Sequence, residues 1–121
     1  MAESMGEPMA DGCLFCRIAN GEIPVSLIAQ NEHAVAFRDL HPQAPVHVLV
    51  IPRRHIASLA QATDADEVGA LSLLAAEVAR SEGISDSGYR TVMNTGVDGG
   101  QTVFHLHLHL LGGRTMTWPP G

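Results

Sequence analysis

Hydrophobic residues and histidines alternate strictly in a predicted strand over 103–111, which contains Phe-His-Leu-His-Leu-His-Leu-Leu. Because successive side chains of a β-strand point to opposite faces, His105, His107 and His109 should share one face. The other face should enter the core. It carries Phe104, Leu106, Leu108 and Leu110.

The rest of the pattern predicts an antiparallel sheet with one long helix packed on it, which is an α+β fold. Short apolar or β-branched runs bounded by turn residues predict strands, and an apolar stripe at helical spacing predicts the long helix. The predicted strands span 25–30, 34–39, 46–51, 89–94 and 103–111, and the predicted helices span 14–19 and 63–82.

The long helix has suitable residues at both ends. Thr63 is the predicted N-cap, and the acidic residues that follow it suit the positive end of the helix dipole. Gly83 is placed to end the helix. The apolar stripe that should face the core comprises Val68, Leu71, Leu74, Ala75 and Val78.

The chain has 121 residues and a net charge of −6, and all its basic side chains are arginines. This length predicts one domain over 13–121, after a disordered leader over 1–12. The charge argues against a nucleic-acid polymer as partner, although backbone amides can hold a single nucleotide. No apolar run approaches the roughly 20 residues of a membrane span, and the acidic N-terminus does not resemble a secretory signal. A cytoplasmic protein without membrane contact is therefore expected.

Three hypotheses account for a row of histidines on one strand face. In the first, the histidines face solvent and have no functional role. A catalytic metal site would use them as ligands and would need an open coordination position. Nucleophilic catalysis would use a neutral imidazole to form a covalent phosphoryl or nucleotidyl intermediate. The glycine-rich turn over 96–100, which could supply backbone donors to a phosphate, favours this third hypothesis.

Four segments carry a family resemblance. The segment 105–111 resembles the signature of the histidine-triad (HIT) superfamily, 37–55 resembles its second block, and 94–102 resembles its phosphate loop. The ending over 112–121 is similar to that of the Hint-type branch, the purine nucleoside phosphoramidases. The resemblance implies a five-stranded antiparallel sheet with one long and one short N-terminal helix. It also implies a two-fold homodimer in which the tail with Trp118 lies near the partner's site.

The resemblance assigns roles to individual residues. His107 would attack the α-phosphorus, His109 would contact the phosphate, and His47 would support the site from the adjoining strand. Thr102, where relatives often have serine, would assist the leaving group, and Asp39 would hold the ribose. The base pocket would comprise Phe15, Ile18, Phe37, Leu40 and Leu49, and the phosphate site Asn94, Gly100, Gln101, Thr102 and Val103. His33 and His41 are expected to be ordinary loop residues.

Both cysteines lie in one Cys-x-x-Cys motif, Cys13 to Cys16. Taken alone, this spacing fits two buried thiols, a redox pair or half of a metal site. The resemblance implies that His55 and His105 complete a structural Cys₂His₂ zinc site, which leaves no open position for chemistry.

The predicted reaction is hydrolysis of a purine nucleoside phosphoramidate, or of an acyl or aminoacyl adenylate, to the nucleoside monophosphate through nucleotidyl-His107. A protonated amine leaves easily, so modest acid assistance suffices. Three alternatives remain: a dinucleoside polyphosphate hydrolase, a nucleotide-binding regulatory protein with incidental hydrolysis, and a metal hydratase.

Overall fold

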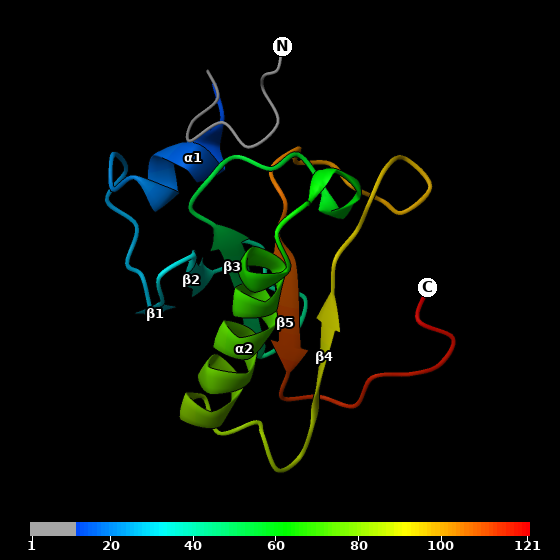
Figure 1. Cartoon of the computed structure of the whole chain (residues 1–121). Coiled ribbons are helices and arrows are strands. Elements are labelled where there is room, and N and C mark those ends of the chain that lie inside the picture. Colours follow the sequence, from blue (N-terminus) through cyan, green and yellow to red (C-terminus); the bar gives the residue numbers. More distant parts are fainter. Residues whose placement is uncertain (1–11) are drawn as a thin grey trace.

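The structure is a computed structural model that describes residues 12–121. The predicted leader lies outside the described residues except for Gly12. Five antiparallel strands form one sheet in the order β1-β2-β3-β5-β4 (Figure 1). The predicted α+β fold is therefore confirmed. The elements are α1 (Leu14–Ala19), β1 (Ala29–Gln30), β2 (Ala34–Arg38), β3 (Val46–Pro52), η1 (Leu59–Gln61), α2 (Ala65–Ser81), β4 (Tyr89–Val92) and β5 (Leu108–Gly112).

Both faces of the central strands are covered. Helix α2 packs along one face (Figure 1), and the apolar side chains of α1 pack on the other. Successive residues of β2 alternate between the two cores: Ala36 joins the α2 side and Phe37 the α1 side. Strand β3 does the same with Val48 and Leu49. Two-sided burial explains why β3 is a nearly continuous apolar run.

The pairing of β3 with β5 places two histidines on the α1 side of the sheet. His47 pairs with Leu111, and Leu49 pairs with His109. Directly paired residues project to the same face, so His47 and His109 are diagonal neighbours there. The same face of the sheet packs against α1. Leu49 lies in an apolar cluster with Phe15, and the ring of His107 contacts the ring of Phe15.

Strand β5 begins at Leu108, five residues later than predicted. Residues 103–107 leave the ladder because their backbone makes other bonds: the Leu106 N–H donates to the Ile56 carbonyl over 2.6 Å. The alternation of side chains nevertheless persists, since Leu106 is buried against α2 while His105 and His107 are buried on the opposite side. The prediction for Phe104 is wrong, because its side chain is 59% exposed.

Other boundaries also differ from the predictions. Residues 25–28 lie outside β1, and Val25 instead packs against the apolar cluster that contains α1. The N-cap of α2 is Asp64, not Thr63, and its carboxylate accepts from the N–H groups of Asp66 and Glu67. Gly83 follows the last turn with a φ of 77°, as predicted for a residue that ends a helix. The short helix η1 was not predicted.

Candidate functional site

The three histidines of the alternating segment have different partners. The Nδ1 atom of His105 lies 3.3 Å from the Cys13 sulfur. The Nδ1 atom of His107 lies 2.8 Å from the backbone carbonyl oxygen of His105. The Nδ1 atom of His109 lies 2.9 Å from Nε2 of His47. Since the three Nδ1 atoms bond to different groups, the triad does not converge on one metal ion, which argues against the three-ligand hypothesis.

The contact with a carbonyl oxygen fixes the tautomer of His107. A carbonyl only accepts hydrogen bonds, so Nδ1 of His107 carries the proton and donates it to His105. In the neutral ring the Nε2 atom then holds a free lone pair. The ring is buried against Phe15, with the ring centroids 5.4 Å apart, and the residue lines a cavity. A neutral imidazole with one free ring nitrogen at a cavity can act as a base or as a nucleophile.

A chain of hydrogen bonds fixes the tautomers of the other pair. The backbone N–H of Gln43 donates to Nδ1 of His47 over 2.9 Å. In neutral His47 the proton therefore sits on Nε2, from which it is donated to Nδ1 of His109. The remaining proton of His109 must then be on Nε2. His109 lines the cavity, so it offers an N–H donor there.

Burial keeps this pair neutral. It lowers the pKa of His109 to about 4, and the nearby rings of His107 and His47 act in the same direction, while Asp39 opposes them. Burial also lowers the pKa of His47, again against the effect of Asp39, whose carboxylate lies 3.4 Å from Nε2. At neutral pH His109 is therefore a neutral donor and not a cation.

A cavity of about 420 Å³ adjoins these groups and carries most of the predicted nucleotide-binding residues. Its walls combine apolar side chains from α1, β2 and β3 with polar groups from the segments before β5. The predicted residues that line it are Phe15, Ile18, Phe37, Asp39, Leu40, Leu49, Asn94, Gly100, Thr102, Val103, His107 and His109.

Two predicted site residues lie behind the cavity wall. His47 is buried and contacts His109, and Gln101 is buried and bonds to backbone groups. Conversely, sequence reasoning missed His41, which lines the cavity. The sequence signal that could have indicated His41 is its position directly after two predicted site residues, Asp39 and Leu40. Other lining residues that were not predicted are Leu14, Val25 and Arg38.

A second group brings together both cysteines and two histidines. The Cys16 sulfur lies 3.3 Å from Nδ1 of His55 and 3.5 Å from Nδ1 of His105. All four ligand atoms of Cys13, Cys16, His55 and His105 lie within 4.8 Å of one another. Around a tetrahedral zinc ion, sulfur and nitrogen ligands are separated by roughly 3.6 Å. The group therefore has the dimensions of a closed tetrahedral site.

The outer partner of His105 also fits metal ligation. Its Nε2 lies 3.0 Å from the Pro52 carbonyl oxygen, so this nitrogen carries the proton and Nδ1 presents a lone pair to the cysteines. Burial lowers the pKa of His105 to about 4, which keeps the ring in the neutral form that binds metals. The donor set of two sulfurs and two nitrogens is one that zinc prefers.

Asp39, His47 and His109 form another cluster of possible ligands. Here the bonding does not fit a metal. Because Nδ1 of His47 accepts from the Gln43 N–H, its Nε2 keeps a proton and has no lone pair to give. This cluster is a hydrogen-bonded chain and not a metal centre.

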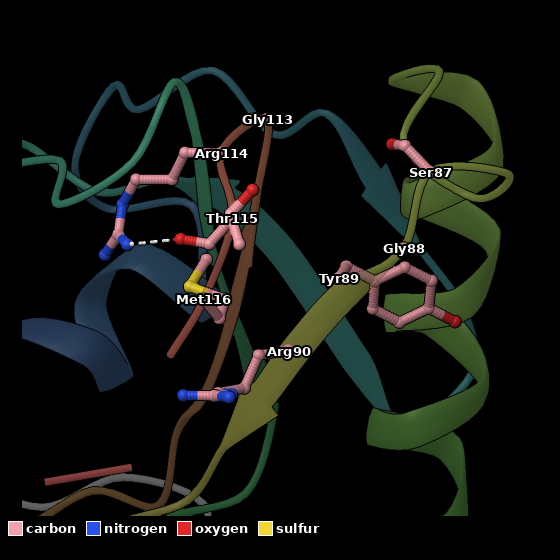
Figure 2. Close-up of a pocket in the computed structure, with 8 residues that line it drawn as sticks. All are labelled: Ser87, Gly88, Tyr89, Arg90, Gly113, Arg114, Thr115 and Met116. Carbon is pink, nitrogen blue, oxygen red and sulfur yellow. Dashed lines mark hydrogen bonds between the residues drawn. The ribbon is translucent and has the colours of Figure 1, made fainter. Parts of the chain in front are cut away.

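A different cavity, of about 510 Å³, lies between the start of β4 and the C-terminal tail (Figure 2). Its two arginines bind backbone carbonyls of the tail and of a neighbouring loop: Arg90 donates to Thr117, and Arg114 donates to Gln43 and Thr115. None of the predicted site residues lines this cavity. These arginines hold the tail in place.

In the part of the chain that the structure describes, no helix is long and apolar enough to cross a membrane.

Comparisons with known proteins agree with this architecture. The family model described as the HIT domain matches residues 20–116. An uncharacterized HIT-like protein of Synechococcus elongatus is 50% identical over 115 residues, covering 93% of this chain and 100% of that protein. The crystal structure of a HIT family hydrolase from Legionella pneumophila has a TM-score of 0.86 at 50% identity, covering 90% of this chain and 99% of that one. A histidine triad nucleotide-binding protein from Candida albicans has a TM-score of 0.76 at 30% identity, with coverage of 88% and 82%.

Proposed function

This chain belongs to the HIT domain family, and we propose that it hydrolyses purine nucleoside phosphoramidates, or acyl and aminoacyl adenylates, to the nucleoside monophosphate. The observation that carries the proposal is the orientation of His107. Its Nδ1–H is held by a backbone carbonyl, so the free Nε2 belongs to a ring that lines the cavity. The names of similar proteins, a hydrolase and a nucleotide-binding protein, support the same class.

The reaction proceeds in two displacements at phosphorus. In the first, the Nε2 lone pair of His107 forms a bond to the α-phosphorus while the bond from phosphorus to the leaving amine or acyl oxygen breaks. The nucleotidyl-His107 formed is cationic, and its Nδ1–H remains bonded to the His105 carbonyl, which stabilises that charge. In the second, water attacks phosphorus, releases a proton and restores neutral His107.

Two residues serve the phosphate and the leaving group. His109 donates its Nε2–H to a phosphate oxygen as a neutral group. Thr102 is exposed at the cavity and delivers its hydroxyl proton to the leaving group, regaining a proton from water. The hydroxyl of threonine can donate the same proton as the serine hydroxyl that the Hint-type resemblance implies at this position.

The base and the ribose occupy the apolar and acidic parts of the same cavity. Phe15 and Phe37 meet edge to face, with centroids 5.7 Å apart, and form an apolar wall for a purine. The carboxylate of Asp39 lies at the cavity and accepts hydrogen bonds from the two ribose hydroxyls.

The cysteine and histidine group holds a structural zinc ion in this proposal. Cys13, Cys16, His55 and His105 supply four protein ligands, so no coordination position is open to substrate. When bound, zinc cross-links α1 to the segments that follow β3 and precede β5. It thereby stabilises the wall of the cavity and leaves the chemistry to His107.

We also propose that the chain forms a two-fold homodimer. Strand β4 is an edge of the sheet, and such an edge offers unpaired backbone groups to a second chain. Near it lies Trp118, which is 80% exposed and whose ring centroid is 5.9 Å from the guanidinium carbon of Arg90 on β4. A dimer would cover this surface and bring the Trp118 tail near the partner's site. Sedimentation of the whole chain should give the mass of two copies, and a monomer at micromolar concentration would contradict this assembly.

The competing functions differ in observable behaviour. A dinucleoside polyphosphate hydrolase would cleave diadenosine polyphosphates faster than adenosine phosphoramidate. A regulatory protein would bind AMP tightly and turn over very slowly. A metal-dependent hydratase would lose activity with its metal, and the diverging bonds of the triad argue against it.

The test is a side-by-side assay of adenosine phosphoramidate and diadenosine polyphosphates with wild type and His107→Gly. We expect the phosphoramidate to be preferred. We also expect the variant to bind AMP while losing nearly all turnover. His33→Gly, on the loop between β1 and β2, is the control for loss of a histidine. Full activity of His107→Gly would exclude the mechanism.

A further inference from the structure

The side chain of Gln101 is buried directly behind the phosphate part of the cavity. It is 7% exposed and does not line the cavity, whereas its neighbours Gly100 and Thr102 do. It was predicted to contact the nucleotide. Its position calls for a different role.

Every hydrogen-bonding group of the Gln101 carboxamide is used within the protein. Its oxygen accepts from the N–H of Gly96 over 3.0 Å. Its nitrogen donates to the carbonyls of Ala57, over 2.7 Å, and Val103, over 3.0 Å. A carboxamide has two N–H donors, and both are occupied. No donor of this side chain remains for a ligand.

The same residue closes the glycine-rich turn through its backbone. The Gln101 N–H donates to the Gly96 carbonyl, and the Gly100 N–H donates to the Val97 carbonyl, each over 3.0 Å. Gly99 cannot carry a side chain there, because a Cβ would collide with the Thr95 carbonyl oxygen. These contacts restrict the shape of the turn, and Gln101 binds its first residue, Gly96, through both its backbone and its side chain.

Two backbone N–H groups that follow Gln101 in the chain are available to a ligand. Among the residues that the structure describes, the N–H groups of Thr102 and Val103 donate no hydrogen bond. Both residues line the cavity. Gln101 binds the carbonyl of Val103 and thereby holds the backbone that carries these two N–H groups. Fixed N–H groups beside a cavity form an anion site.

We propose that Gln101 is a positioning residue that aims the backbone N–H groups of Thr102 and Val103 at the substrate phosphate. The inference rests on the proposed function, because it requires a phosphate in this cavity. Gln101 itself touches no substrate atom. Its loss should weaken the interaction with phosphate and leave the base and ribose contacts unchanged.

The first test compares AMP with adenosine, which lacks the phosphate. Gln101→Met keeps the length of the side chain and removes its three hydrogen bonds. We expect the affinity for AMP to fall about tenfold or more, since hydrogen bonds to a charged group are strong, while the affinity for adenosine changes less than about twofold. Gln61→Met, on η1, is the matched control and should leave both affinities unchanged.

The result would overturn the proposal if AMP and adenosine lost affinity equally, because that pattern marks a general loss of structure. An unchanged AMP affinity in Gln101→Met would also overturn it. If wild type bound AMP no better than adenosine, the proposed function itself would fail, which is a distinguishable outcome.

A measurement on wild type covers the case in which Gln101→Met does not fold. Hydrogen exchange should be slow at the Gly96 N–H without ligand, because Gln101 binds it. Addition of AMP, but not of adenosine, should slow exchange at Thr102 and Val103. Fast exchange at Gly96, or no selective effect of AMP, would contradict the proposal.

Discussion

Acidification should destabilise this protein through His109. Burial and the neighbouring rings lower the pKa of His109 to about 4 in the folded chain, whereas a histidine in the unfolded chain titrates near 6.5. The unfolded state therefore binds more protons as the pH falls below about 6.5. The stability contributed by neutral His109 is fully present above pH 6.5 and is lost between pH 6.5 and 4.

The size of this loss follows from the two pKa values. Integration of the linkage relation gives a loss of about 1.4 kcal/mol at pH 5.5 and about 2.5 kcal/mol at pH 4.5 for His109 alone. His47 adds a loss of the same sign, since burial lowers its pKa too. Such losses are a large part of the roughly 5–15 kcal/mol that stabilises a typical domain.

The assay is urea unfolding of wild type and His109→Asn at pH 7.5, 5.5 and 4.5. The variant lacks the titrating ring, so its free energy of unfolding should fall less with acid than that of wild type. Between pH 7.5 and 4.5, the free energy of unfolding of wild type should fall by about 2.5 kcal/mol more than that of His109→Asn. His33→Asn is the control for loss of one histidine. Parallel pH profiles for wild type and His109→Asn would refute the account of a buried neutral pair.

Three further predictions concern the metal, the ribose and the leaving group. Freshly purified protein should contain about one zinc per chain; Cys13→Ala should lose it and unfold at a lower temperature, and retention of full zinc by elemental analysis would contradict this ligand set. Asp39→Asn should weaken binding of AMP roughly tenfold but that of 2′,3′-dideoxy-AMP little, and equal losses in calorimetric titration would remove Asp39 from ribose recognition. Thr102→Val should keep AMP affinity and lower kcat for adenosine phosphoramidate roughly 10- to 100-fold, whereas an unchanged kcat would exclude its hydroxyl from leaving-group release.

The buried strands of the sheet could be predicted, because the pattern of their side chains follows from strand geometry alone. Val48 and Leu49 are both apolar because each faces a different core, and a run of such residues predicts a buried strand. The long helix was predictable from its stripe, which includes Leu71 and Leu74, both fully buried. Its N-cap was not, because Thr63 and Asp64 are both good capping residues and only the backbone geometry distinguishes them.

The start of β5 depended on contacts between distant residues. Nothing in the alternation of 104–111 indicates that the Leu106 N–H bonds to Ile56 instead of to a neighbouring strand. The exposure of Phe104 likewise follows from where the segment leaves the sheet. Side-chain alternation predicts which face a residue belongs to, but not whether the backbone is paired.

Within the site, the sequence predicts which residues take part better than it predicts where their side chains point. The signature around His107 predicts this residue as the nucleophile. The carbonyl that fixes its tautomer belongs to the backbone of His105, and no residue type in the sequence indicates that contact. The same holds for the Gln43 N–H, which fixes His47. Gln101 was predicted to line the phosphate site, but its side chain is buried and bonds to backbone groups of the protein.

The most direct test of the account is to trap the covalent intermediate. Wild type is mixed briefly with adenosine phosphoramidate, quenched and analysed by mass spectrometry. Nucleophilic catalysis by His107 predicts that one nucleotidyl group is added per chain, that peptide mapping places it on His107, and that the group is lost as the substrate is consumed. Turnover without any adduct on quenched protein, or an adduct on another residue, would contradict nucleophilic catalysis by His107.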